Sequence, residues 1–340
     1  MEGIQFKMKA YIKAISYYLP ERIVTNEELV AEFPEWTVEK IANKVGVLER
    51  RVADIDETSA DIAICAAEKL FSEYKDIDRA DIDFVLFCTQ SPDYFLPSSA
   101  CIIQNRLGLK TSCGAFDFNL GCSGYVYGLA VAKGLIAGGI AKNVLLLTGE
   151  TYNKYLHSRD KGNRTIFGDA ATATIISTDG FAQILDFALG TNGAGAENLI
   201  VKTGASRNPE KKGDLSFDEN GNPHSSDYLY MNGAEIFTFT QKNVPAVVIE
   251  TLEKNGLHKE DIKMYVFHQA NSYMLNFLRK KIKIDSDKFF INMEKIGNTV
   301  SNSIPIALVD AMESNLLQGN VLICGFGVGY SWGGCVLNFK

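Results

Sequence analysis

Three side chains with the chemistry needed for acyl transfer lie at turns that follow strand-like or polar segments: Cys122, His268 and Asn298. Cys122 stands where the apolar run 116–120 meets a glycine turn and then a helical pattern. A helix N-terminus favours a thiolate and offers free amides to an oxyanion. We therefore predict that Cys122 is a nucleophile, and the alternative is a small buried core cysteine.

The other two candidates also have structural alternatives. His268 ends the apolar run 264–267, where a buried strand would deliver it to a ligand, but a lone histidine is more often a hydrogen-bonded structural residue. Asn298 lies in a polar glycine turn before a helical pattern, so it is either a donor in a site or a helix cap. No His, Cys or carboxylate pair has metal-ligand spacing, so no metal is expected.

A glycine-rich segment, 325–333, follows the apolar run 321–324. Its spacing is not that of a dinucleotide fingerprint, and no P-loop occurs in the chain. We interpret it as a loop whose backbone amides can approach a reacting carbonyl closely.

An internal repeat predicts the elements that must position these residues. Two strand-like runs in the first part of the chain match two in the second part at nearly equal separations: 81–88 matches 261–268, and 143–147 matches 320–323. Between its two runs, each part has a strand, a glycine turn and an apolar helix. The alternation of strands and helices predicts parallel sheets covered by helices, in two similar α/β halves at 8–180 and 181–340. The polar stretch 203–227 is expected to be a surface hairpin or loop between them. Ligands bind at the carboxyl ends of such strands.

The composition excludes several classes of protein. The 340 residues are 46% hydrophobic and carry a net charge of -7, which is typical of a globular protein and argues against a nucleic-acid-binding surface. No apolar run is long enough for a membrane helix, and there is no signal-peptide core. Seven cysteines without CxxC spacing predict reduced thiols, mostly in the core, and a cytoplasmic protein. Residues 1–7 are expected to be an extra leader.

Taken in order, several motifs resemble the β-ketoacyl-acyl-carrier-protein synthase III family. They are YLPE (18–21), EW (35–36), GVLERR (46–51), FLPSSAC (95–101), GCSG (121–124), FGD (167–169), HQAN (268–271), GNT (297–299) and GFGVGYSWG (325–333). The resemblance covers the chain from residue 8 to residue 340. It implies a thiolase-like α/β fold, in which two duplicated halves form a layered α-β-α-β-α core, and a homodimer.

The resemblance also implies a catalytic triad of Cys122, His268 and Asn298. Cys122 would take an acyl group from an acyl-CoA, and malonyl-acyl-carrier protein would then lose CO2 and attack the thioester. Two neutral donors can stabilise the resulting enolate without a metal or another cofactor. Phe326 would form an apolar wall beside the departing carboxylate, and the amides of Cys122 and Val328 would form the oxyanion hole.

The resemblance assigns more peripheral positions to substrate recognition. Trp36 and Lys161 match positions that bind coenzyme A, with Arg164 as a nearby alternative. Leu96 stands where the family often has a phenylalanine that reaches into the partner's acyl pocket, so the preferred acyl chain stays open. A basic cluster, Arg279, Lys280 and Lys281, is the local patch that an acidic carrier protein would need, or else a solvated helix end.

Three functions remain open at this stage. The first is a decarboxylating condensation, in ordinary fatty acid synthesis or in a specialised pathway. The second is acyl transfer to a hydroxyl or amine by the same cysteine, and the third is a non-catalytic subunit that binds acyl chains or a partner synthase. The pair of His268 and Asn298 favours condensation, because simple acyl transfer needs no enolate stabilisation.

Overall fold

A ten-stranded sheet forms the centre of the computed structural model, which describes residues 8–340. The predicted leader, 1–7, lies outside the described residues. The strands stand in the order β14 (Phe289–Phe290), β13 (Ile262–Phe267), β15 (Gly319–Gly327), β16 (Ser331–Phe339), β8 (Ala182–Thr191), β1 (Tyr11–Tyr18), β7 (Ala170–Ser177), β6 (Val144–Glu150), β4 (Phe84–Cys88) and β5 (Gly114–Phe118).

The sheet has the same strand pattern on both sides of its centre. From the edge inward, β5, β4 and β6 run parallel, and β7 and β1 are antiparallel to their neighbours. The other side repeats this with β14, β13, β15, β16 and β8. The two sides join through only two residue pairs between β1 and β8. The strands that matched in the sequence, 81–88 and 261–268, thus occupy equivalent places.

The expectation of parallel sheets was wrong for the inner strands. Only three strands in each half are parallel, and the two inner strands of each half are antiparallel. The burial of β6 and β7 explains the error, because every residue of these strands is buried. A strand covered on both faces reads as a continuous apolar run whatever its direction.

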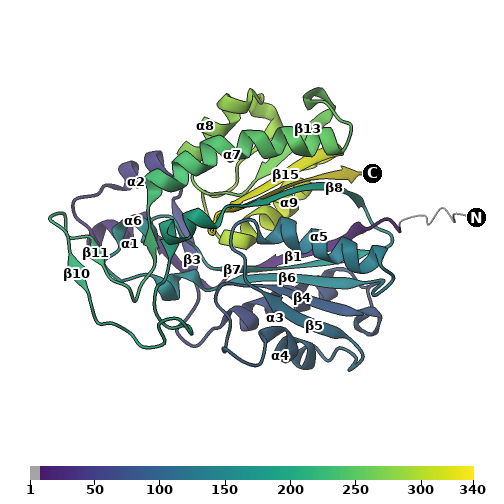
Figure 1. Ribbon diagram of the computed structural model, residues 1–340, viewed down its shortest axis with the longest axis horizontal. Coiled ribbons are helices and arrows are strands. Elements are labelled where there is room, and N and C mark those ends of the chain that lie inside the picture. The colour runs from purple at the N-terminus through teal and green to yellow at the C-terminus, as the bar shows by residue number, and fades with distance from the viewer. Residues whose placement is uncertain (1–7) are drawn as a thin grey trace, which may run out of the picture.

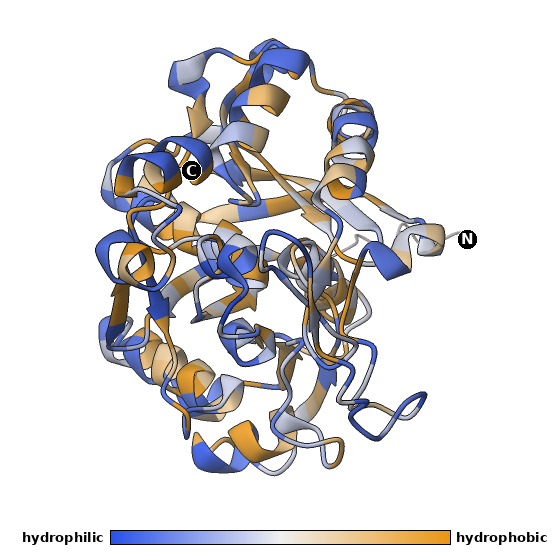
Figure 2. Ribbon diagram, turned by 90° about the vertical axis from the view of Figure 1, so that its left-hand side faces the viewer, coloured by the Kyte–Doolittle hydropathy of each residue, from blue (hydrophilic) through white to orange (hydrophobic). Residues whose placement is uncertain are grey.

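Helices and sheet halves alternate in five layers, which agrees with the expected thiolase-like fold (Figure 1). Between the two halves lie α5 (Gly124–Ala137) and α9 (Ser303–Glu313), whose side chains share one apolar cluster with strands of both halves. One outer face is covered by α3 (Ser59–Glu73) and α4 (Ser99–Arg106), and the other by α7 (Gly233–Lys254) and α8 (Ser272–Ile282). The outer helices carry apolar and polar residues side by side, as a one-sided contact requires (Figure 2).

The remaining elements gather at one end of the molecule, beside the carboxyl ends of the parallel strands (Figure 1). The polar stretch 203–227 includes an exposed two-stranded hairpin. Here lie α1 (Asn26–Glu32), α2 (Val38–Val45), α6 (Lys161–Arg164), β2 (Arg22–Thr25), β3 (Glu49–Val52), β9 (Leu199–Ile200), β10 (Ser216–Phe217), β11 (Pro223–His224) and β12 (Tyr230–Met231). Short 3-10 turns are η1 (Arg79–Asp81), η2 (Tyr152–Tyr155), η3 (Gly193–Asn198), η4 (Lys259–Asp261), η5 (Ser286–Lys288) and η6 (Val300–Asn302).

The expectation that most of the cysteines lie in the core is confirmed, since four of the seven are buried. All seven are free, but Cys65 and Cys101 are exposed and Cys113 is half-buried. Cys88, Cys324 and Cys335 are buried, as is Cys122. Within residues 8–340, no helix has the length and apolarity to cross a membrane.

Candidate active site

Cys122 lies in the turn between β5 and α5, with 7% of its surface exposed. Glycines of β15 pack directly on it. A Cβ atom added to Gly327 would be 2.9 Å from Cys122 Sγ, and one added to Gly325 would be 2.7 Å from the Cys122 carbonyl oxygen. Real Cβ atoms do not approach other atoms so closely, so both positions need glycine.

The helix N-terminus was expected to favour a thiolate at Cys122, but in the unliganded protein burial outweighs this effect. α5 begins two residues after Cys122, as expected. Burial nevertheless raises the pKa of the Cys122 thiol to about 12, and the negative charge of Glu150 raises it further, while the amides of Cys122 and Val328 oppose this. Desolvation disfavours the charged form more than these two amides favour it.

The backbone amides of Cys122 and Val328 both lie near the thiol, since both act to lower its pKa. Val328 lies in the turn between β15 and β16. The glycine-rich segment is not a long loop, because β15 continues through Gly327 and β16 begins at Ser331. Two N–H groups near one sulfur are suited to bind an oxyanion formed on a carbon attached to it.

His268 follows β13 and is 1% exposed. Its backbone N–H donates to the Cys324 carbonyl, and its Nδ1 lies 2.7 Å from Ser303 Oγ. Burial lowers the pKa of His268 to about 3, although a backbone contact with Val300 opposes this. The imidazole is therefore neutral at any pH near 7.

Asn298 lies in the turn before η6 and is 6% exposed. Its backbone is fixed at both ends, because its N–H donates to Ile166 and its carbonyl accepts from Gly168. Its side-chain Oδ1 accepts from the Val300 N–H at 2.9 Å, and Nδ2 faces the Ala270 carbonyl at 3.4 Å. Asn298 thus caps a turn and also lies beside the segment that carries His268.

One strand, β15, links the nucleophile to the histidine. The Phe326 ring packs edge to face on His268, with 5.5 Å between centroids, and the next residue, Gly327, contacts Cys122 Sγ. Phe326 is 2% exposed. The structure therefore brings Cys122, His268, Asn298, Phe326 and Val328 into one site.

Sequence reasoning missed two buried groups beside this site. Glu150 ends β6 and is fully buried next to Cys122, and Ser303 contacts His268. Glu150 stands at the carboxyl end of an apolar run, so the rule that selected His268 could also have selected it. Nothing in the sequence pattern distinguishes Ser303 from the other serines that follow Asn298.

Comparison with known proteins agrees with this geometry. Family models of 3-oxoacyl-[acyl-carrier-protein] synthase III match residues 116–193, and models of its C-terminal part match 252–339. The β-ketoacyl-[acyl-carrier-protein] synthase III of Caldanaerobacter subterraneus subsp. tengcongensis is 35% identical, over 98% of this chain and 99% of that protein. This chain belongs to the β-ketoacyl-acyl-carrier-protein synthase III family. It is accordingly an enzyme of the acyl-transferring class.

Solved structures of synthase III enzymes have the same fold. A crystal structure titled 3-oxoacyl-(acyl-carrier-protein) synthase III superimposes with a TM-score of 0.94 at 47% identity, covering 97% of this chain and 100% of that one. A synthase from Burkholderia xenovorans superimposes with a TM-score of 0.89 at 35% identity, covering 98% and 95% of the two chains. The layered core is therefore the thiolase fold of this family.

The residues that the synthase III resemblance assigned to coenzyme A lie together at one end of the molecule. Lys161 pairs with Glu35, the neighbour of Trp36, and donates to the Asn220 carbonyl at 2.7 Å. The indole of Trp36 is covered by Lys40, whose Nζ is 4.8 Å from the ring centroid. Trp36 therefore stacks with a lysine of the helix that follows it, α2, rather than with Lys161.

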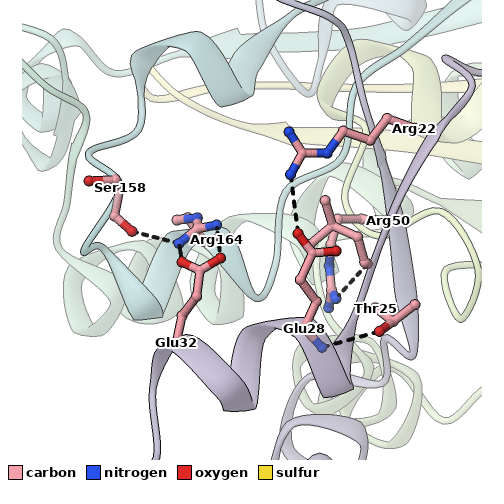
Figure 3. Close-up of polar contacts among 8 residues, drawn as sticks. Arg22, Thr25, Glu28, Glu32, Arg50, Ser158 and Arg164 are labelled. Carbon is pink, nitrogen blue, oxygen red and sulfur yellow. Dashed lines mark hydrogen bonds and ion pairs between the residues drawn. The ribbon is translucent and has the colours of Figure 1, made fainter.

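Arg164 is held by internal partners (Figure 3). Its guanidinium pairs with Glu32 through two contacts, one of them 3.1 Å, and donates to the Ser158 carbonyl at 2.6 Å. Its side chain is 18% exposed. A ligand phosphate would have to compete with Glu32 for Arg164 and with Glu35 for Lys161, whose side chain is 13% exposed, so the structure favours neither cation over the other.

Leu96 does not line a pocket within its own chain. It is 82% exposed, beside Phe95 at 86% and Tyr94 at 62%. Phe95 and Tyr94 instead border a cavity of about 770 Å³, together with Tyr152, Leu199 and Val328. Since the Val328 amide reaches Cys122, this cavity is adjacent to the nucleophile.

The basic cluster occupies the last turn of α8. Lys280 and Lys281 are exposed, whereas Arg279 is half-buried and donates to the Ile284 carbonyl at 3.1 Å. The two lysines are therefore available to a partner, and Arg279 mainly closes the end of its helix. Within residues 8–340, no group of three or more His, Cys, Asp or Glu side chains could hold a metal ion.

Proposed function

We propose that this enzyme condenses an acyl-CoA primer with malonyl-acyl-carrier protein, through an acyl thioester on Cys122, to give 3-oxoacyl-carrier protein, CO2 and CoA. This is the reaction that the names of its relatives describe, and it starts an acyl chain. Phe326 and Gly327 carry the proposal, because they place the histidine and the nucleophile on the two sides of one short stretch of β15.

In the first step, Cys122 sulfur attacks the carbonyl carbon of the acyl-CoA. The amides of Cys122 and Val328 stabilise the oxyanion, the carbon–sulfur bond to CoA breaks, and CoA leaves as its thiol with the proton that Cys122 gives up. Because burial holds the free thiol protonated, we propose that Cys122 loses its proton only as the substrate arrives. This limits side reactions of the unliganded thiol.

In the second step, malonyl-carrier protein loses CO2, and negative charge develops on its thioester oxygen. Neutral His268 and the Asn298 amide donate hydrogen bonds to that oxygen. The apolar Phe326 ring favours neutral CO2 over the carboxylate. The enolate carbon then bonds to the acyl carbon, and the Cys122 sulfur leaves and regains a proton.

Ser303 is the contact on which the His268 tautomer depends. For His268 Nε2 to donate, Nδ1 must accept a proton from Ser303 Oγ, which lies 2.7 Å away. The Ser303 hydroxyl also lies 3.1 Å from a second acceptor, the Val300 carbonyl. The proposed step therefore requires that Ser303 donate to Nδ1 and not to Val300.

We further propose a homodimer that works in the cytoplasm. The exposed apolar side chains Tyr94 and Phe95 border the cavity beside Cys122, Leu96 is exposed next to them, and a second copy would cover all three. Trp36 and Lys161 would bind the nucleotide part of coenzyme A, and Lys280 and Lys281 the acidic carrier protein. Whether the product enters ordinary fatty acids or a specialised pathway depends on the primer.

A two-stage assay tests the function. Purified enzyme given acyl-CoAs of two to twelve carbons should gain the acyl mass at Cys122, and then release CO2 when malonyl-carrier protein is added. Labelling without CO2 release would favour transfer to another acceptor. The absence of labelling with every chain length would refute an acyl-enzyme altogether.

Substitutions test the division of roles. Cys122→Ala should abolish labelling, whereas His268→Ala and Asn298→Ala should retain labelling and lose CO2 release by roughly 100-fold or more, as for the removal of an oxyanion donor. Equal loss of both steps in all three variants would contradict the assignment. Circular dichroism and oligomeric state show whether each variant is folded.

A further inference from the structure

Glu150 is a buried carboxyl group for which the proposed mechanism has no role. It is the last residue of β6 and is fully buried. None of the lysines, arginines and histidines in the described part of the chain forms an ion pair with it. A buried carboxyl without a counter-ion is costly, so its hydrogen bonds and surroundings call for a physical explanation.

The hydrogen bonds of Glu150 connect the two halves of the molecule. From the first half, the Gln90 N–H donates at 3.1 and 3.2 Å to the two oxygens, and Ser91 Oγ donates at 3.2 Å. From the second half, Ser301 Oγ donates at 3.4 Å. Ser301 follows Asn298 by three residues, so one carboxyl group ties the Asn298 turn to the segment after β4.

Both ends of this bridge lie against the nucleophile. A Cβ atom added to Gly121 would be 2.6 Å from the Gln90 side-chain oxygen, and one added to Gly124 would be 3.5 Å from Ser301 Cβ. Gln90 and Ser301 therefore flank the short turn that holds Cys122. A displacement of the Glu150 carboxyl would move the Cys122 turn and the Asn298 turn relative to each other.

The charge state of Glu150 is coupled to that of Cys122. Burial raises the pKa of Glu150 to about 8, its hydrogen bonds oppose this, and the charge of Asp169 adds to it. The other titratable groups that sense its charge are Cys122, Cys88, Tyr152 and Tyr155, and none of them is a cation. A negative charge on Glu150 therefore acts directly against a negative charge on Cys122 sulfur.

We propose that Glu150 is a positioning residue that works as a neutral carboxylic acid: it locks the Asn298 turn to the Cys122 turn, and its ionisation suppresses the Cys122 thiolate. The role in decarboxylation rests on the proposed function, whereas the effect on the thiol does not. In the neutral form one oxygen carries a proton and can donate it to Ser91 or Ser301, whose hydroxyls both donate and accept.

The thiol effect is tested by alkylation with iodoacetamide between pH 6 and 10, with each cysteine followed by peptide mass. Glu150→Gln keeps the shape and one acceptor oxygen for the Gln90 N–H, replaces the other oxygen by an NH2 donor that a serine hydroxyl can accept, and cannot ionise. We expect the curve of Cys122 alkylation rate against pH to move to lower pH in this variant. Where the rate rises with pH, a thiol pKa lowered by one unit makes alkylation about tenfold faster. Exposed Cys101 in the same sample and the exposed-site variant Glu253→Gln are the controls, and neither should change.

If the alkylation rate of Cys122 depends on pH in Glu150→Gln as it does in the wild type, the proposal is overturned. This result is independent of the condensation reaction, because alkylation needs neither coenzyme A nor carrier protein. If wild-type enzyme fails to release CO2, the proposed function fails while the alkylation result still stands.

The bridging role has its own test, which does not depend on the folding of a Glu150 variant. Ser301→Ala removes the hydrogen bond that Glu150 accepts from the second half, so we expect faster amide hydrogen exchange in 297–303 and slower CO2 release, with Cys122 acylation retained. Ser314→Ala removes an exposed serine hydroxyl bonded to Asp310 and should change neither. Unchanged exchange and CO2 release in Ser301→Ala would also overturn the proposal.

Discussion

A Cβ atom added to Gly327 would lie 2.9 Å from Cys122 Sγ, which is closer than van der Waals contact. On this side, the backbone of β15 therefore confines Cys122 directly. A backbone wall cannot rotate away, which fixes the sulfur relative to the Val328 amide.

Gly327→Ala should therefore block the nucleophile without removing any catalytic group. The added methyl must displace either Cys122 or β15, so we expect acylation to fall by about 100-fold, as for a misplacement near 1 Å. Acyl-enzyme formation measured by mass is the readout. Gly134→Ala on α5, where a Cβ meets no atom within 4 Å, is the control and should acylate normally.

The pH dependence of CO2 release should show no histidine titration near pH 6.5. The pKa of His268 is lowered to about 3 by burial, so the ring is already neutral at pH 5 and stays neutral as the pH rises. A profile of CO2 release from malonyl-carrier protein between pH 5 and 8 checks this. A step near pH 6.5 that disappears in His268→Gln would show that the imidazole titrates and contradict the neutral-donor role.

Reversing the charge of Lys280 and Lys281 should weaken the second substrate only. We expect Lys280→Glu/Lys281→Glu to raise KM for malonyl-carrier protein by about tenfold, with a smaller effect at high salt, because exposed charges are screened. Acylation by acyl-CoA should be unchanged. Lys211→Glu/Lys212→Glu carries the same charge change in the exposed segment 203–227 and should leave KM unchanged.

Trp36→Ala should separate recognition of the nucleotide from the chemistry. Loss of the indole should raise KM for acyl-CoA several-fold, since stacking on an aromatic ring contributes about 1–3 kcal/mol. A short acyl thioester of N-acetylcysteamine lacks the nucleotide and should be used equally well by both proteins. A similar loss with both substrates would show that Trp36 supports the fold of α2 instead.

Much of the architecture can be predicted from the sequence, because the buried strands appear there as apolar runs and the runs of one half repeat in the other. The match of 81–88 with 261–268 reflects two strands that occupy equivalent places in the sheet. The direction of β7 and β16 could not be predicted, because doubly covered strands are apolar in either orientation. The raised pKa of the Cys122 thiol could not be predicted either. The sequence indicates that a helix starts near Cys122, but not how deeply the thiol is buried.

Long-range polar contacts also could not be predicted from the sequence. Glu150 and Ser301 are 151 positions apart, and no local pattern in either segment points to the other. The three candidate catalytic residues could be predicted because each lies at a recognisable turn. Their neighbours Ser303, Glu150 and Gly327 could not, because they contact these residues only in the folded chain.

The ladder between β15 and β16 pairs nine consecutive residues, from Gly319 with Phe339 to Gly327 with Ser331, without an interruption. Side chains along a strand alternate between its two faces, so Phe326 and Gly327 serve opposite sides of the same backbone. A slip of one residue would put a phenyl ring against the sulfur and leave the imidazole without its aromatic neighbour. The register of this one hairpin therefore positions the residues of both half-reactions. A change in the length of β15 would disturb both together.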